Sequence, residues 1–166
     1  LASLGIRKVR LTGGEPLQKV PFLKGWLPTL SGRKILLETA GIHFQELREI
    51  IDQISIVSMD LKLPSSTGMQ AWWREHASFL KLARQKEVYV KVVVTEETED
   101  RHVQWAAELV ASIDPEIPFI LQPATAFGRF RAVPLPDQLA RWWRETRQIL
   151  PKSRVVPQIH KLMGVA

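Results

Sequence analysis

The stretch VRLTGGEPLQ, residues 9–18, joins an apolar strand to two adjacent glycines, an acid and a proline. Glycine pairs after a strand often bind phosphate, because bare backbone N–H groups attract anions. Glu15 argues against an anion, since its carboxylate would repel a phosphate placed beside Gly13 and Gly14. The same carboxylate would pair well with an ammonium group held against side-chain-free backbone. The stretch therefore predicts a strand-to-helix turn that binds a cationic ligand.

Strand and helix patterns alternate along the rest of the chain. Six segments are rich in Val, Ile and Leu and nearly continuous in apolarity, as buried parallel strands are. The predicted strands are 8–12, 34–39, 54–62, 88–95, 119–125 and, more weakly, 154–159; the predicted helices lie near 43–53, 68–86, 99–113 and 135–150, with a less regular one near 16–30. This alternation predicts an α/β fold with a parallel sheet and alternating helices.

The length of the chain limits how much of a barrel it can form. Its 166 residues can bury a core, but a complete (β/α)₈ barrel needs roughly 250 residues. We therefore predict that residues 1–166 form a single domain, a partial barrel. Residue 1 is Leu, and residues 1–12 read as the tail of a helix, a glycine stop and a strand. We expect from this that a first βα unit is missing from the sequence.

The composition bears on partners and location. The net charge of +6, from 23 basic and 17 acidic residues, makes nucleic acid a partner to consider. The charges are scattered over predicted helix faces and form no basic stripe with interleaved aromatics, which favours a solvated surface. No apolar run approaches the roughly 20 residues of a membrane span. The absence of cysteine fits a cytoplasmic protein without disulfides. We expect neither nucleic acid nor membrane as a partner.

Polar residues follow five of the predicted strands. In a parallel sheet, ligands bind at the carboxyl ends of the strands, so these residues belong to one candidate site. They are Thr12 to Glu15, Glu38 to Gly41, Asp60 to Ser66, Thr95 to Glu97 and Gln122 to Thr125. A purely structural sheet would not need polar groups on so many loops, so the arrangement favours a binding site.

Six motifs along the chain carry a family resemblance. They are LTGGEPL (11–17), LETAG (37–41), MDLKLPSS (59–66), VKVVV (90–94), LQPAT (121–125) and VVPQIHKLMGV (155–165). With them, the chain resembles the radical S-adenosylmethionine superfamily and, within it, the 7-carboxy-7-deazaguanine synthases. The resemblance implies a partial radical S-adenosylmethionine barrel. It also implies a carbon–nitrogen lyase of queuosine biosynthesis, which converts 6-carboxy-5,6,7,8-tetrahydropterin to 7-carboxy-7-deazaguanine with loss of ammonia.

The resemblance also implies roles for residues of the strand-end loops. Gly13, Gly14 and Glu15 would hold the methionine amino group of S-adenosylmethionine. The other implied cofactor contacts are Glu38 and Thr39 near the ribose, Asp60, Leu61 and Lys62, and Gln122 and Pro123 beside the adenine; Thr12 and His160 would face the pterin substrate. The residues alone also allow a plain turn with a helix-starting acid at Glu15, a local ion pair between Asp60 and Lys62, and a packed His160.

Radical chemistry of this type needs a 4Fe–4S cluster held by three cysteine thiolates, and the chain has no cysteine. In the family, the cluster motif and the residue that binds Mg²⁺ precede the TGGEP strand. His43, His76 and His102 lack metal-ligand spacing, so we expect no metal site in this chain. We therefore expect this fragment to be inactive by itself, and we assign no catalytic residue.

Other functions and partners remain open at this point. A glycyl-radical-enzyme activase also carries GGEP and DLK motifs, and a cluster-less module could simply bind a nucleoside. The tetrapeptide WWRE occurs at 72–75 and 142–145. Since adjacent tryptophans on a helix cannot both face the core, one of each pair would pack at a rim or a subunit contact. We expect a homodimer and an external electron donor.

Overall fold

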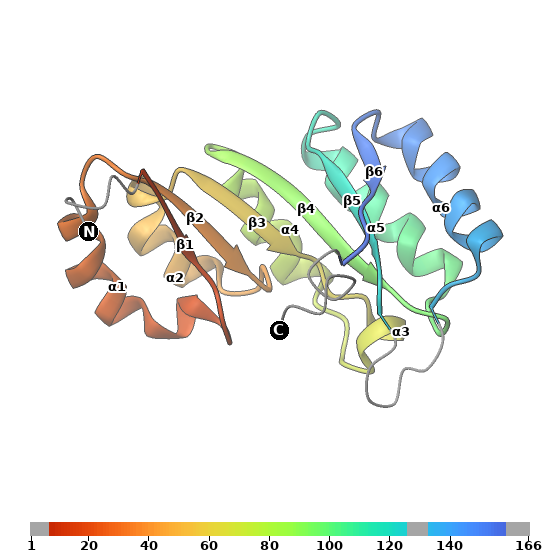
Figure 1. The fold of residues 1–166 in the computed structure, drawn as a ribbon, viewed down its shortest axis with the longest axis horizontal. Helices are drawn as coiled ribbons and strands as arrows, with labels where there is room; N and C mark the ends of the chain where they lie inside the picture. Colours follow the sequence, from red (N-terminus) through yellow and green to blue (C-terminus); the bar gives the residue numbers. More distant parts are fainter. Residues whose placement is uncertain (1–6, 126–132, 159–166) are drawn as a thin grey trace. The chain divides into compact units, whose positions relative to one another are not determined.

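The computed structural model describes residues 7–125 and 133–158. Within these residues, six strands follow one another in the sheet in the order of the sequence, from β1 to β6 (Figure 1). The strands are β1 (Lys8–Leu11), β2 (Lys34–Thr39), β3 (Ile56–Asp60), β4 (Glu87–Val94), β5 (Phe119–Pro123) and β6 (Ser153–Val155). The α-helices are α1 (Val20–Trp26), α2 (Phe44–Ile50), α3 (Pro64–Thr67), α4 (Trp73–Ala83), α5 (Asp100–Ile113) and α6 (Pro136–Ile149). The predicted α/β fold with a parallel sheet, as in part of a (β/α) barrel, is confirmed.

Contacts divide the chain into two compact units. The first unit comprises Leu1–Asp60 and Arg74–Tyr89, and the second comprises Leu61–Trp73 and Val90–Ala166. Strands β1 to β3 belong to the first unit and β5 and β6 to the second, and β4 begins in the first unit and continues in the second from Val90. The prediction of a single domain over residues 1–166 stays a prediction.

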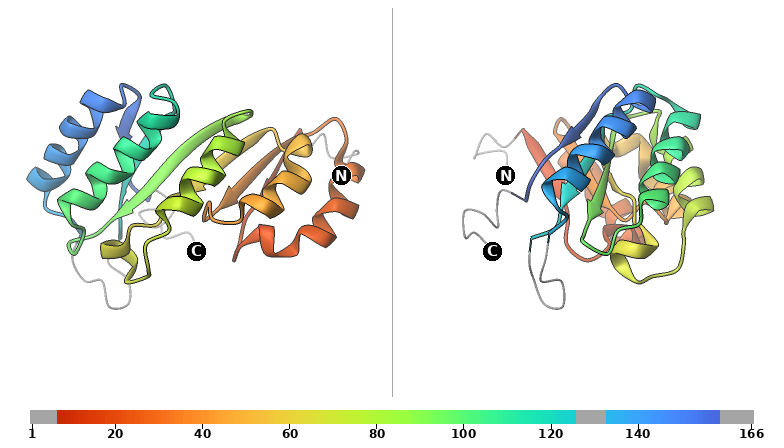
Figure 2. Two further views of the ribbon diagram at one scale, coloured as in Figure 1. Left: turned by 180° about the vertical axis from the view of Figure 1, so that it is seen from behind. Right: turned by 90° about the vertical axis from the view of Figure 1, so that its right-hand side faces the viewer.

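In the first unit, β1, β2 and β3 pair in parallel. Lys8 pairs with Lys34 at the start of β1, and Thr39 pairs with Met59 near the end of β3. Helices α1, α2 and α4 lie on one side of these strands (Figure 2). Burial along β2 alternates, with Ile35 and Leu37 buried and Leu36 half-buried. One face of these strands is therefore covered by helices, while the other is less covered and carries polar side chains as well.

In the second unit, β4, β5 and β6 also pair in parallel, from Val90 with Phe119 to Leu121 with Val155. Helices α5 and α6 cover one face of these strands (Figure 2). Helix α5, predicted near 99–113, packs through an apolar stripe of helical spacing. The buried members of this stripe are Val103, Ala106, Ala107 and Val110.

Most element boundaries agree with the predicted ranges, and the main difference lies between β3 and β4. The sequence predicts one helix near 68–86, whereas the chain forms the short helix α3 and then α4. Gly68 has a φ of 68° and caps the end of α3, and its N–H bonds to the carbonyl of Pro64. A left-handed glycine ends a helix, so the chain cannot run from α3 directly into α4. The region predicted near 16–30 consists of 3-10 helix η2 (Pro16–Lys19), α1 and 3-10 helix η3 (Leu27–Leu30).

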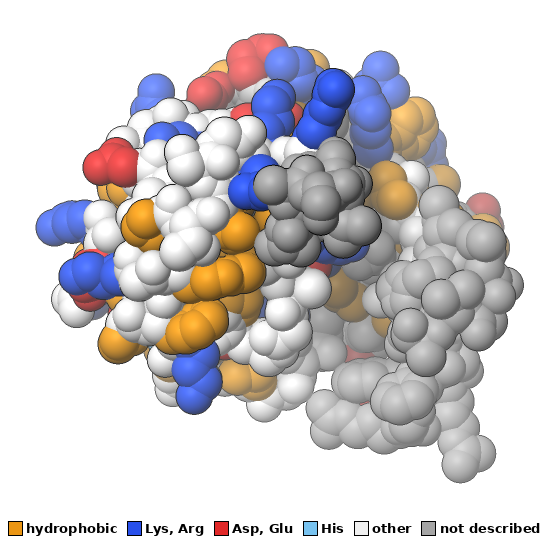
Figure 3. Space-filling view, turned by 60° about the vertical axis from the view of Figure 1, so that its left-hand side comes forward, with side chains coloured by type: hydrophobic (Ala, Val, Ile, Leu, Met, Phe, Trp, Pro, Cys, Tyr) orange, Lys and Arg blue, Asp and Glu red, His pale blue; other side chains and the backbone are white. Residues whose placement is uncertain are grey.

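The surface carries its basic side chains at separate places. Lys and Arg side chains are dispersed on the face shown in Figure 3, with hydrophobic side chains exposed between them. In the described part of the chain, no helix has both the length and the apolar character needed to cross a membrane.

Candidate functional site

The glycine turn after β1 has a backbone that suits glycine. Gly13 and Gly14 have φ values of 93° and 55°, in the left-handed region that other residues seldom adopt. Among the described residues, no atom lies within 4 Å of a Cβ atom built on either glycine. Both residues are exposed. The turn therefore presents bare backbone to open space, as a site for a ligand that approaches the main chain requires.

The Glu15 carboxylate links this turn to the end of β2. Its Oε1 accepts hydrogen bonds from the N–H of Leu17, at 3.1 Å, and from the hydroxyl of Thr39, at 2.8 Å. Its Oε2 accepts from the N–H of Ala40, also at 2.8 Å. By binding the Leu17 N–H, Glu15 also caps helix η2, which begins at Pro16. The first two strand-end loops are thus held together by one carboxylate.

A second carboxylate lies on the less covered face of the same strands. Arg10 Nη2 donates to Glu38 Oε1, and Thr12 Oγ1 donates to Glu38 Oε2 at 2.8 Å. The hydrogen bond to Glu38 raises the pKa of Arg10 above its usual value, so the guanidinium is charged at every physiological pH. The predicted cofactor residue Glu38 and the predicted substrate residue Thr12 are therefore in direct contact.

The loop after β2 depends on Gly41, which sequence reasoning did not single out. Gly41 has a φ of 68°, and a Cβ atom at this position would lie 2.6 Å from Cγ of the buried Met59. Its carbonyl oxygen lies 3.0 Å from Nδ1 of His76, a fully buried residue of α4. The glycine that ends the LETAG motif was the available signal, because a glycine directly after a strand marks a special turn.

The remaining predicted cofactor residues fall at the ends of β3 and β5. Asp60 is the last residue of β3 in the first unit, whereas Leu61 and Lys62 belong to the second unit. Leu61 is buried, and its N–H donates to the Lys91 carbonyl at 2.8 Å. Gln122 and Pro123 end β5 and are half-buried. The roles predicted for these five residues stay predictions.

Other polar residues of the strand-end loops bind one another in the second unit. Ser66 Oγ lies 2.7 Å from Thr98 Oγ1, which also accepts the N–H of Thr95 at 2.7 Å. Ser65 Oγ accepts the N–H of Glu99 and lies 2.8 Å from Nδ1 of His102. The serines of the LPSS motif therefore join α3 to the loop between β4 and α5. These hydroxyl groups have a structural use that the sequence did not reveal.

Two of the motifs that carry the family resemblance meet in the same unit. Thr125, the last residue of LQPAT, donates its hydroxyl to Oε1 of Gln158 at 2.9 Å. The backbone N–H of Val156 donates to the carbonyl of Leu121. The segment that leads to His160 thus runs beside the end of β5. His160 itself lies outside the described residues.

Metal-ligating side chains do not gather in the described parts of the chain. Within residues 7–125 and 133–158, no group of three or more His, Cys, Asp or Glu side chains could hold a metal ion. His43 lies beside Glu46, and His102 packs against Trp73 and Trp105. These residues offer no support for a Mg²⁺ site.

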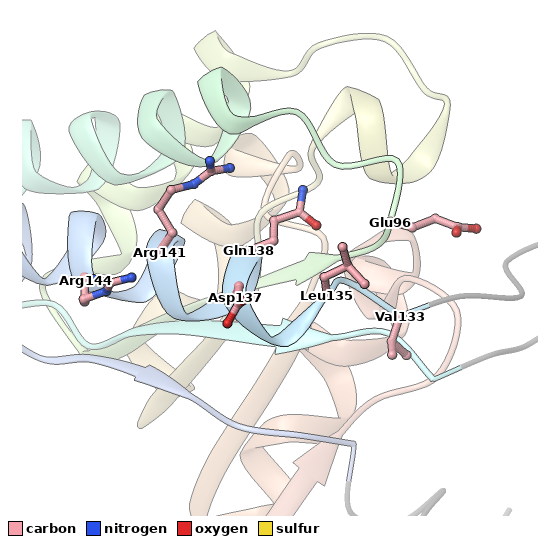
Figure 4. A pocket seen from close by; sticks show the side chains of 7 residues that line it. All are labelled: Glu96, Val133, Leu135, Asp137, Gln138, Arg141 and Arg144. Carbon is pink, nitrogen blue, oxygen red and sulfur yellow. The ribbon is translucent and has the colours of Figure 1, made fainter.

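A large cavity lies elsewhere in the second unit. It has a volume of about 750 Å³. Its lining comprises Glu96, Val133, Leu135, Asp137, Gln138, Arg141 and Arg144 (Figure 4). The guanidinium of Arg141 is also bound by both carboxylate oxygens of Asp100, at 2.7 and 2.8 Å. Glu96 is one of the polar strand-end residues, but none of the described residues with a predicted cofactor or substrate role lines this cavity, so the candidate site remains the turn between β1 and η2.

Comparisons with known proteins agree with the family resemblance that the motifs carry. No family model matches the chain. Three curated proteins named 7-carboxy-7-deazaguanine synthase are similar to it over most of its length. The protein from Geobacter sulfurreducens is 36% identical over 94% of the chain, that from Thermococcus kodakarensis 30% over 96%, and that from Methanopyrus kandleri 34% over 93%.

The chain spans 62%, 64% and 59% of the lengths of these relatives, in the same order. The similarity therefore covers almost all of this sequence but about six-tenths of each relative. On these matches, and on the motifs that the structure places at the strand ends, the chain is similar to the 7-carboxy-7-deazaguanine synthases over the part of their length that it spans.

Proposed function

We propose that the complete protein is a radical S-adenosylmethionine lyase, a 7-carboxy-7-deazaguanine synthase. It would convert 6-carboxy-5,6,7,8-tetrahydropterin to 7-carboxy-7-deazaguanine and ammonia, a conversion whose atoms balance without an added oxidant. The three relatives with this name support the proposal. The structural observation that carries it is the exposed turn of Gly13, Gly14 and Glu15 at the carboxyl end of β1.

The residues of this turn fit S-adenosylmethionine. A Cβ atom at Gly13 or Gly14 would project into open space, which the methionine part of the ligand could occupy. Glu15 would add a charge-assisted hydrogen bond to the ammonium group, since a carboxylate has about four lone-pair sites and three donors reach this one. S-adenosylmethionine would supply the radical that starts the ring contraction.

The remaining roles in the site are proposed on the family resemblance. Glu38 and Thr39 would bind the ribose, while the end of β3 and the end of β5 would complete the cofactor contacts. The contact residues at those two ends are Asp60, Leu61, Lys62, Gln122 and Pro123. Thr12 and His160 would orient the pterin.

The iron–sulfur cluster does not fit this chain. The sequence contains no cysteine, and oxygen and imidazole ligands seldom hold such a cluster. In the proposed enzyme the cluster ligands, and any ligand of Mg²⁺, would come from residues beyond these 166. These 166 residues would bind part of the cofactor and would not catalyse the reaction alone.

The two other candidate functions have less support. A glycyl-radical-enzyme activase shares the GGEP and DLK motifs, but the matched relatives are named as synthases. A cluster-less nucleoside-binding module would not account for the similarity to proteins that are named as synthases. A cytoplasmic location, a homodimer and an external electron donor belong to the same proposal.

The test uses the complete protein with its cluster, reductant and S-adenosylmethionine under anaerobic conditions. We expect 7-carboxy-7-deazaguanine and ammonia in equal amounts from 6-carboxytetrahydropterin. Transfer of a radical to a partner protein, with the pterin unchanged, would favour the activase.

Gly13→Ala tests the turn itself, with Gly32→Ala as its matched control. Both glycines have left-handed backbone, with φ values of 93° and 80°, and both have open space at the Cβ position. The two substitutions should therefore strain the backbone alike, while only Gly13→Ala should weaken S-adenosylmethionine binding. Equal affinities in a calorimetric titration of the two variants would exclude the turn as the cofactor site.

A further inference from the structure

Arg10 donates a hydrogen bond to Glu38 of the candidate site, although it lies outside the six motifs that carry the family resemblance. It lies on β1, two residues before Thr12, so both side chains leave the strand on the same face. Each donates to a different oxygen of Glu38. The Arg10 side chain is 60% exposed and that of Glu38 is 19% exposed. The arginine therefore meets the carboxylate from the solvent side and restrains it against the strand.

These two bonds fix the direction of the hydrogen bonds at Thr12. A hydroxyl has one proton to donate and two lone pairs that accept. An ionised carboxylate only accepts, so the Thr12 proton is committed to Glu38 Oε2, at 2.8 Å. Toward a ligand, the Thr12 oxygen then offers only its lone pairs.

Thr39, in the same unit, is a hydroxyl whose proton and one of whose two lone pairs are used within the protein. It donates its proton to Glu15 and accepts the N–H of Gly41 at 3.2 Å. Thr39 is buried, whereas Thr12 is exposed. Within the described residues, no donor reaches Thr12 Oγ1. Thr12 is thus an exposed hydroxyl at this edge whose accepting capacity is accessible to a ligand.

We propose that Arg10 is a positioning residue that, by holding Glu38, presents Thr12 as a hydrogen-bond acceptor for ring N–H groups of a reduced pterin. The proposal rests on the proposed function. A tetrahydropterin carries N–H donors at two ring nitrogens that, in the oxidised pterin, are bare acceptors. The Thr12 oxygen would accept hydrogen bonds from the N–H groups of the tetrahydropterin and would repel the bare ring nitrogens of the oxidised pterin. The arrangement therefore selects the reduction state of the substrate.

The first test is a double-mutant cycle in the complete protein, read as the affinity for 6-carboxytetrahydropterin in anaerobic calorimetry. Arg10→Gln should weaken binding by about three- to tenfold, the range expected for one misplaced hydrogen bond. Arg10→Lys should restore part of the affinity. In a Glu38→Gln background, Arg10→Gln should cause no further loss, because Arg10 acts through Glu38.

Lys8→Gln is the matched control for the loss of one positive charge. Lys8 is exposed on the same face of β1, two residues before Arg10. Lys8→Gln should change the affinity for 6-carboxytetrahydropterin less than twofold, because the charge of Lys8 does not reach Glu38. The positioning role would be overturned if Arg10→Gln lost no more affinity than Lys8→Gln. It would also be overturned if Arg10→Gln lost as much affinity in the Glu38→Gln background as in the wild-type background.

The second test compares the reduced ligand with the oxidised 6-carboxypterin. Thr12→Val should weaken binding of the reduced pterin by about three- to tenfold, but not that of the oxidised one, while Thr12→Ser should resemble the wild type. Equal losses for both ligands would overturn the acceptor assignment. If the wild-type protein binds neither pterin, the proposed function itself has failed. If it converts the reduced pterin but the variants do not discriminate, this inference alone has failed.

Discussion

The two units use polar strand-end residues in opposite ways. In the first unit, Thr12 and Glu15 bind neighbouring side chains at an edge where the glycine turn stays exposed. In the second unit, Ser66 and Thr98 are 5% and 4% exposed and bind each other. Both sets consist of polar residues in the loops that follow parallel strands.

The difference shows that position after a strand does not by itself identify a ligand contact. A buried hydroxyl must find a partner in the protein, because an unsatisfied polar group costs about 1–3 kcal/mol. Thr98 therefore completes its hydrogen bonds inside the second unit. At the exposed turn of the first unit, water or a ligand can complete them instead. Ligand binding is thus to be sought where polar groups are held in place but still accessible.

The largest effect should come from Gly41→Ala, which tests how tightly the loop after β2 packs against Met59. A left-handed alanine costs about 1–2 kcal/mol, and the new Cβ would press on Met59, where overpacking costs about 1–3 kcal/mol more. We expect the free energy of unfolding to fall by about 3 kcal/mol in a urea titration.

Gly32→Ala separates the two causes of that loss. Gly32 has a φ of 80° but open space at its Cβ position, so only the backbone term applies. The control should lose about 1–2 kcal/mol. If both variants lose the same amount, Met59 makes room for the new methyl group and the packing argument is wrong.

The next largest loss of stability should come from Thr98→Val, in the second unit. Thr98→Val keeps the shape of the side chain but leaves the N–H of Thr95 and the hydroxyl of Ser66 without their shared partner. We expect a loss of about 2 kcal/mol in unfolding free energy. Thr12→Val, at the exposed edge of the first unit, should lose no more than about 0.5 kcal/mol. Similar losses at the two positions would erase the contrast between the units.

Much of the fold could be predicted from the sequence, because it depends on periodicity. Apolar runs separated by helical patterns predicted where strands and helices follow one another along the chain. Continuous apolarity did not show that one face of β2 would be less covered, because Leu36 is apolar and only half-buried. Coverage of a sheet depends on where the helices pack, which is a tertiary property.

The partners within the candidate site were less predictable. The glycine turn could be located from the pattern, since a strand followed by two glycines restricts the backbone strongly. The contact between Arg10 and Glu38 could not, because the two residues are 28 positions apart and their meeting depends on the register of β1 and β2. In the same way, the three donors to Glu15 could be recognised only once the two loops lay side by side.

Glu15→Gln should lower stability less than Gly41→Ala or Thr98→Val, and it tests whether one carboxylate can both join two loops and bind a ligand. Glutamine has one accepting oxygen, so it can keep the hydroxyl of Thr39 or the N–H of Ala40, but its NH₂ group cannot accept the other. We expect a loss of about 1 kcal/mol in unfolding free energy, together with roughly tenfold weaker S-adenosylmethionine binding in the complete protein. Glu49→Gln on α2, which removes an exposed carboxylate paired with Lys24, is the control and should change neither quantity measurably. If Glu15→Gln lowers stability while the affinity is unchanged, the carboxylate only joins the loops, and the first unit resembles the second after all.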